Sequence, residues 1–165
     1  MAAGGANALD RGAAPDGVTF LPQLPHHLKY RVFLEPLAVC QMAPDARIPA
    51  WPPGGGFFSV VRARDETSIV CPENDSADRV RLEDRMPAGS EIERGWVALK
   101  LEGPFPFSMT GVLASFIEPL AVAQIPIFAI STFATDYVLI KRERLEQAVG
   151  ALGAAGHKNL GDQAP

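Results

Sequence analysis

The chain has 165 residues, of which 47% are hydrophobic, with a formal net charge of −4 and a pI near 5.3. This length suits one ordinary domain or two small, closely packed ones, and the hydrophobic content is sufficient for a real core. Nucleic acids and anionic membranes are bound mainly through clustered Lys and Arg, so the acidic balance argues against both as partners. No apolar run approaches the roughly 18 residues of a membrane-spanning helix.

The N-terminus and the cysteines indicate the compartment. Residues 1–14 lack the basic and apolar regions of a signal peptide, so we expect a cytoplasmic protein. Cys40 and Cys71 both fall within predicted strands, and we expect buried thiols and no disulfide. His157, at the end of a predicted helix, is expected at the surface. No Cys/His cluster has metal-ligand spacing, and we predict neither a metal nor a cofactor.

The first half of the chain predicts strand, short turn, strand, strand. Residues 1–21 are rich in Ala and Gly without a sustained period, which predicts a flexible tail. After it come a strand at 37–42, a proline-rich stretch at 44–53 with at most one helical turn, and a hairpin of strands at 57–62 and 67–71. Mixed charges over the polar loop 73–88 predict an exposed segment that holds at most a short helical turn.

The second half has clearer periodicity. Residues 96–102 alternate as a half-buried strand does, and Gly103-Pro104 ends it. Apolar residues at helical spacing predict a helix from Gly111 to about Ala121, with Thr110 as N-cap and Pro119 inside. A strand at 125–130, apolar on both faces, reads as a central strand. A turn at 133–136, a strand at 137–140, a helix at 145–152 and an edge strand or frayed end after Gly153 follow.

Two segments carry a family resemblance. They read G-P-F-P-F-S-M-T-G-V-L at 103–113 and I-P-I-F-A-I-S-T-F-A-T-D-Y-V-L-I at 125–140. Together they resemble the ACT-domain family, in particular the regulatory ACT domains of aspartate kinases and the cytosolic arginine-sensor ACT domains. The resemblance covers roughly residues 37–157.

The resemblance implies an α+β protein with the ferredoxin-like ACT fold (βαββαβ), antiparallel sheets and helices on one face. It further implies two ACT-like units, a degenerate one at 22–90 and a C-terminal ACT domain at 91–157, followed by a C-terminal tail at 158–165. Strands that are apolar on both faces need cover from the partner unit or another subunit, so we predict a homodimer.

The loop 103–111 and Asp136 together predict a binding site. The loop ends at a helix N-terminus, where free amides and the helix dipole favour a carboxylate. Asp136 begins a strand directly after a turn and could accept from an ammonium or guanidinium group. The resemblance places a ligand between ACT units, against this loop, Asp136 and the start of the strand at 125–127. The candidate ligand-binding residues are Met109, Thr110, Gly111, Ile125, Pro126, Ile127, Ser131, Thr132 and Asp136.

Structural interpretations of the same residues remain open. Asp136 can cap a turn with its own side chain, and Ser131 and Thr132 are compatible with plain strand pairing. Gly111 can serve close helix–sheet packing. The two prolines of the loop remove amide donors, and Met109 stands where the arginine sensors carry an acidic residue. These departures argue against arginine as the ligand.

We therefore predict a non-catalytic regulatory or sensor protein that binds a small amino acid at the interface of ACT-like units and tunes an enzyme or signalling partner. The alternative is a constitutive oligomerisation or scaffold protein without a small-molecule ligand. An enzyme is a third interpretation, but the chain has no Gly-x-Ser-x-Gly elbow, Walker loop or His-Glu-x-x-His motif.

Overall fold

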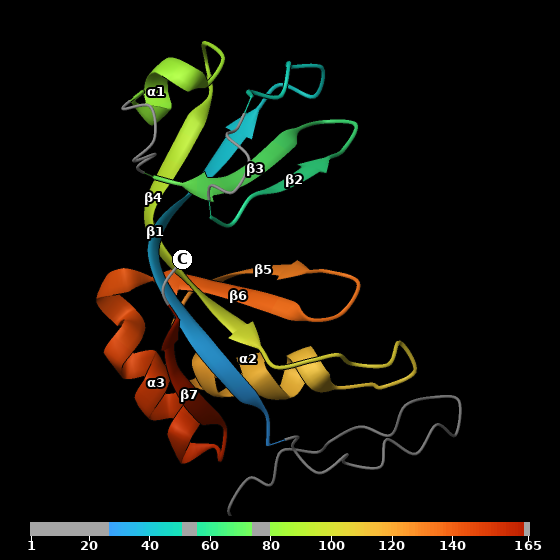
Figure 1. Cartoon of the computed structure of the whole chain (residues 1–165), viewed down its shortest axis with the longest axis vertical. Coiled ribbons are helices and arrows are strands. Elements are labelled where there is room, and N and C mark those ends of the chain that lie inside the picture. The colour runs from blue at the N-terminus through green and yellow to red at the C-terminus, as the bar shows by residue number, and fades with distance from the viewer. Residues whose placement is uncertain (1–26, 51–55, 74–79, 164–165) are drawn as a thin grey trace, which may run out of the picture.

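The computed structural model describes residues 27–50, 56–73 and 80–163, so the predicted tail at 1–21 and part of the proline-rich stretch lie outside the described residues. The strands form one seven-stranded sheet in the order β2-β3-β1-β4-β6-β5, and β7 pairs with β1 (Figure 1). None of the helices in the described ranges has the length and apolar character needed to span a bilayer. The elements are β1 (Lys29–Met42), β2 (Ser59–Arg62), β3 (Thr67–Pro72), α1 (Leu82–Arg85), β4 (Glu91–Leu101), α2 (Val112–Val122), β5 (Ile127–Ser131), β6 (Asp136–Lys141), the 3-10 turn η1 (Arg142–Arg144), α3 (Leu145–Ala154) and β7 (Lys158–Gln163).

Strand β1 runs through both halves of the molecule. Its first part pairs antiparallel with the end of β4 and parallel with β7, and its last part pairs with β3 and the start of β4. The ladder to β4 shifts register between Phe33 and Leu37. Pro36 lies at this irregularity, where a missing N–H does not remove a regular ladder bond. The predicted strand at 37–42 was therefore only the second part of a 14-residue strand.

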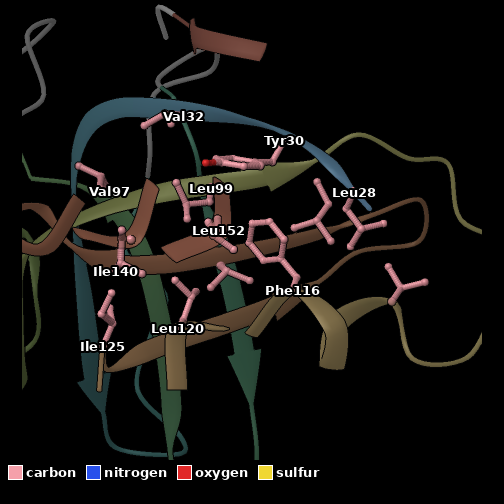
Figure 2. Close-up of a cluster of buried hydrophobic side chains, with 14 residues drawn as sticks. Leu28, Tyr30, Val32, Val97, Leu99, Phe116, Leu120, Ile125, Ile140 and Leu152 are labelled. Carbon is pink, nitrogen blue, oxygen red and sulfur yellow. The ribbon is translucent and has the colours of Figure 1, made fainter. Parts of the chain in front are cut away.

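The largest hydrophobic cluster lies between the sheet and the helices α2 and α3. Tyr30, Val97 and Leu99 approach it from the strands, and Phe116 and Leu152 approach it from the helices (Figure 2). Both helices therefore cover one face of this half of the sheet, as predicted. Burial raises the pKa of the Tyr30 phenol to about 12, because the anion would be desolvated there.

A second cluster lies under α1 in the other half of the sheet. It contains Cys40 and Cys71, which are both fully buried free thiols, together with Leu82 and Met86. The expectation of buried thiols is thus confirmed. Leu82 also explains why the polar loop 73–88 contains a helical turn: the turn buries this one apolar side chain against the strands.

A third cluster joins the two halves on the sheet faces that the helices leave uncovered. Val70 of β3 and Leu139 of β6 belong to it, although their strands are separated by β1 and β4 in the sheet order. The ring centroids of Phe57 and Tyr137 lie 4.7 Å apart across this junction. The sheet is therefore bent so that the two halves share apolar cover.

Within the second half, the predicted order of strand, helix, strand, strand, helix is confirmed. The prediction of a central strand at 125–130 is wrong, since β5 lies at the end of the sheet order. Both faces of β5 are apolar because both are covered. Ile127 packs on the largest hydrophobic cluster, between the sheet and the helices, and Phe128 packs on the third cluster. Residues 158–163, at the start of the predicted tail, form strand β7.

The start of β7 also corrects the expectation for His157, which is only 5% exposed. Its Nδ1 accepts a hydrogen bond from the Leu28 amide at 3.1 Å, and its Nε2 lies 3.0 Å from the Ser115 carbonyl oxygen. The imidazole thereby joins β1, α2 and β7. The division of the chain at residue 91 stays a prediction, and β1 contributes strand pairing to both halves.

Candidate ligand-binding site

A surface cavity of about 330 Å³ lies where the loop after β4 meets the first turn of α2 and the turn between β5 and β6. All of the described residues in its lining come from the second half of the chain. The third cluster fills the junction between the two halves with side chains. The lining residues are Phe105, Pro106, Phe107, Met109, Gly111, Val112, Leu113, Ala114, Ser131, Thr132, Phe133, Ala134, Thr135 and Asp136.

Hydrogen bonds hold the loop against the β5–β6 turn. The Phe105 amide donates to the Ala134 carbonyl oxygen at 3.0 Å, and the Thr135 hydroxyl donates to the Leu101 carbonyl oxygen at 2.6 Å. A Cβ atom on Gly103 would lie 2.4 Å from the Ala134 carbonyl oxygen, which is closer than real contacts allow. Glycine at 103 therefore permits the close approach that forms one wall of the cavity.

The first turn of α2 supplies donors on one side of the cavity. The helix begins at an N-cap Gly111 with φ of 78°, a left-handed conformation that suits glycine. The prediction that Thr110 is the N-cap is therefore wrong. The first backbone bond of the helix runs from Ser115 to Gly111, so the amides of residues 112–114 have no acceptor within the helix. With no acidic residue in this turn, the helix end favours an anion.

Asp136 supplies an acceptor on the other side. Ser131 and Asp136 are the last pair of the β5–β6 ladder, and the Ser131 hydroxyl donates to Asp136 Oδ1 at 2.5 Å. Thr132 has a different role, because its hydroxyl donates to the Thr135 carbonyl oxygen at 2.8 Å and also accepts from the Thr135 amide. The strand-pairing interpretation therefore fits Ser131, whereas Thr132 lies beyond the end of β5 and its hydroxyl bonds within the turn. The second carboxylate oxygen of Asp136 makes no hydrogen bond to the described part of the chain.

Aromatic side chains form the outer rim. Phe107 is 80% exposed and Phe133 is 85% exposed, and their rings meet edge to face with centroids 5.2 Å apart. Met109 lies beside them and is 44% exposed. Sequence reasoning missed Phe105, Phe107 and Phe133 as site residues. An available signal was the presence of large aromatic residues in a loop and a turn tip, where small and polar residues are usual.

The structure brings some of the predicted residues together and not others. Met109, Gly111, Ser131, Thr132 and Asp136 all line the cavity, whereas Thr110 does not. Residues 125–127 lie at the opposite end of β5, where Ile127 pairs with Ile140. At ~3.3 Å per residue, the four steps from Ile127 to Ser131 span roughly 13 Å. Ile125 is buried in the cluster below the helices. A ligand role for residues 125–127 stays a prediction without support from this cavity.

Comparison with known proteins identifies the class. Residues 91–154 match the family model of an ACT domain, and residues 35–78 match the model of a separate N-terminal domain. A protein from Agobacterium tumefaciens of known crystal structure is 36% identical over 84% of this chain and 96% of its own, with a TM-score of 0.69. The chain belongs to the ACT-domain family.

More distant structures share the fold. A protein of unknown function from Vibrio cholerae is 16% identical over 79% of this chain and 91% of its own, with a TM-score of 0.53. The regulatory subunit of aspartate kinase from Thermus thermophilus, in a ligand-free form, is 16% identical over 76% of this chain and 95% of its own, with a TM-score of 0.52. At this level of identity, the likeness is one of fold alone.

Proposed function

We propose that this protein is a non-catalytic regulatory or sensor protein that binds a free amino acid in the cavity between α2 and the β5–β6 turn. The observation that carries the proposal is that the residues opening α2 and Asp136 line the same cavity. A zwitterionic amino acid needs donors for its carboxylate and an acceptor for its ammonium group, and these two elements supply both. Bonds that involve charged groups are shorter and stronger than neutral ones.

The prolines of the loop do not weaken this proposal. Pro104 and Pro106 lack amide hydrogens, but the donors in question belong to residues 112–114, which follow the loop. Membership in the ACT-domain family supports a regulatory role, and one structurally similar protein is itself the regulatory subunit of an aspartate kinase. An enzyme or signalling protein would be the regulated partner.

We propose further that the protein acts as a homodimer and that the ligand lies between the second halves of two copies. Phe107 and Phe133 give a contiguous apolar rim that water covers in the single chain. A second copy seated on this rim would bury both rings and close the cavity mouth. The interface of ACT-like units in the proposal is thus the one between copies, because the junction within the chain is filled by the third cluster.

Thermal denaturation in the presence of each of the twenty amino acids tests the proposal. A ligand that binds only the native state raises the Tm, and the rise grows with the logarithm of the ligand concentration above Kd. We expect at least one amino acid to raise it, and Asp136→Ala to abolish the rise. Glu118→Ala removes an exposed carboxylate of α2 that does not line this cavity, so it should keep the response. A Tm that no amino acid changes would contradict the proposal.

The exposed rim favours a second candidate function, a constitutive oligomerisation or scaffold protein. This candidate predicts a stable dimer whose mass in light scattering is the same with and without amino acids. It also predicts that Phe133→Ala dissociates the dimer, while Asp136→Ala has no effect in any assay.

A further inference from the structure

We infer that the cavity selects amino acids with uncharged, apolar side chains of the size of leucine, isoleucine, methionine or phenylalanine. This inference rests on the proposed function and adds the ligand class. The inference is argued from the charges and the apolar walls of the cavity. The proposed function, in contrast, is argued from the groups that would bind the amino and carboxylate groups of the ligand.

Among the described residues that line the cavity, Asp136 alone has an ionisable side chain. If Asp136 receives the α-ammonium group, the described lining has no second carboxylate for the side chain of lysine or arginine. It also has no basic side chain for that of aspartate or glutamate. A charged group that leaves water without a partner is strongly disfavoured. Charged amino acids would therefore bind more weakly than neutral ones.

Two charged side chains that precede the loop of the cavity line a different surface depression. Lys100 and Glu102 line a neighbouring depression that also includes Gly103 and Pro104 and shares Ala134 and Thr135 with the cavity. The Lys100 ammonium group lies over the Tyr137 ring, 5.7 Å from its centroid. Neither side chain lines the cavity that contains Asp136.

The walls beyond the head group are apolar. Nine of the lining residues have apolar side chains, and the larger ones include Phe105, Phe107, Met109, Leu113 and Phe133. Phe133 and Met109 stand at the mouth, where a ligand side chain would leave the polar end and exchange water for these walls. Burial of each further methylene group strengthens binding, so a four-carbon side chain gains considerably over that of alanine. The volume of about 330 Å³ lies at the lower end for small-molecule pockets, which suits a single amino acid.

The test compares affinities across ligand classes by isothermal titration calorimetry of the full chain. The panel is leucine, isoleucine, methionine and phenylalanine, then glycine and alanine, then arginine, lysine, aspartate and glutamate. We expect the best of the first group to bind at least about tenfold more tightly than alanine and than any charged amino acid.

Two variants probe the walls and the charge. Phe133→Ala removes a ring of the cavity lining, and it should weaken the binding of leucine or phenylalanine several-fold more than the binding of alanine. Met109→Glu places a second carboxylate at the mouth of the cavity. It should weaken the binding of the apolar amino acids and strengthen the binding of arginine or lysine. If Phe133→Ala weakened the binding of alanine and leucine equally, the proposed contact between Phe133 and the ligand side chain would be wrong.

Failure of this inference is separable from failure of the proposed function. A chain that binds arginine or glutamate as tightly as leucine overturns the ligand class, while amino-acid binding itself stands. A chain that binds none of the panel overturns the proposed function and the ligand class with it. If the Asp136→Ala chain still binds leucine, the ligand does not bind in this cavity, and both the proposed function and the ligand class lose their assigned site.

Discussion

The hydroxyl of Ser131 donates to Oδ1 of Asp136 over 2.5 Å, where the β5–β6 ladder ends at the edge of the cavity. The bond directs the carboxylate and leaves Oδ2 for a ligand. We predict that Asp136→Asn lowers amino-acid affinity more than Ser131→Ala does, because the first removes the charge and the second only its support. Ser131 is exposed, so Ser131→Ala should change the free energy of unfolding by less than ~0.5 kcal/mol. Calorimetric titration and urea unfolding measure the two effects, and equal loss of affinity in both variants would contradict the assignment.

Two glycines should respond to alanine in opposite directions. Gly103→Ala places a Cβ 2.4 Å from a backbone carbonyl oxygen that cannot rotate away, so the loop or the turn must shift. We expect a loss of about 1–3 kcal/mol in the free energy of unfolding. Gly150 lies in α3 with open space around it, so Gly150→Ala should add up to about 1 kcal/mol. Urea denaturation of both variants checks the prediction, which a stable Gly103→Ala chain with unchanged unfolding would refute.

Phe116 should be among the most important side chains for stability. It is fully buried, and its ring makes edge-to-face contacts with Tyr30 at 5.3 Å and His157 at 5.2 Å. We expect Phe116→Ala to lower the free energy of unfolding by about 3–5 kcal/mol through lost contacts and a new cavity. Val122→Ala truncates an exposed side chain of α2 and should alter it by less than ~0.5 kcal/mol. If Phe116→Ala does not fold, Phe116→Leu gives a smaller loss that urea denaturation can measure.

His157 should make stability depend on pH. Because Nδ1 accepts from the Leu28 amide, the proton of the neutral ring is on Nε2 and is donated to the Ser115 carbonyl oxygen. Protonation of the ring would place a hydrogen on Nδ1, which would then face the N–H of Leu28 and lose that hydrogen bond. Burial, with a smaller contribution from the nearby His27, lowers the pKa of His157, while the bond to Ser115 opposes the shift. The unfolded chain therefore takes up a proton more readily than the folded one.

The sign follows from linkage: this contribution to stability is present above the ordinary histidine pKa of about 6.5 and is lost as the pH falls below it. We expect the Tm of the native chain to drop between pH 7.5 and pH 5.5. His157→Gln should have a lower Tm at pH 7.5 but a smaller drop. His27 is present in both chains and serves as the internal control. Parallel pH profiles for the two chains would exclude His157 as the responsible group.

Local sequence patterns determined most elements of the second half and part of the candidate site. The alternation of residues 96–102, the helical spacing after Gly111 and the turn before Asp136 are all properties of neighbouring residues, and each appears in the structure. Because the loop after β4 and the β5–β6 turn both lead to one end of the sheet, five of the nine candidate residues meet at one cavity.

Tertiary contacts decided the rest. β1 continues through Pro36 because a register shift accommodates it, and β7 is a strand because β1 offers it a parallel partner. A strand with two apolar faces can lie in the centre of a sheet or at the edge of a bent sheet whose two halves cover it, and the sequence is the same in both cases. The position of β5 therefore depended on residues distant in the sequence. The same holds for His157, whose burial depends on Leu28 and Ser115. Hydrogen bonds between strands and side-chain contacts between distant residues leave no periodic trace in the sequence, and only folding brings their partners together.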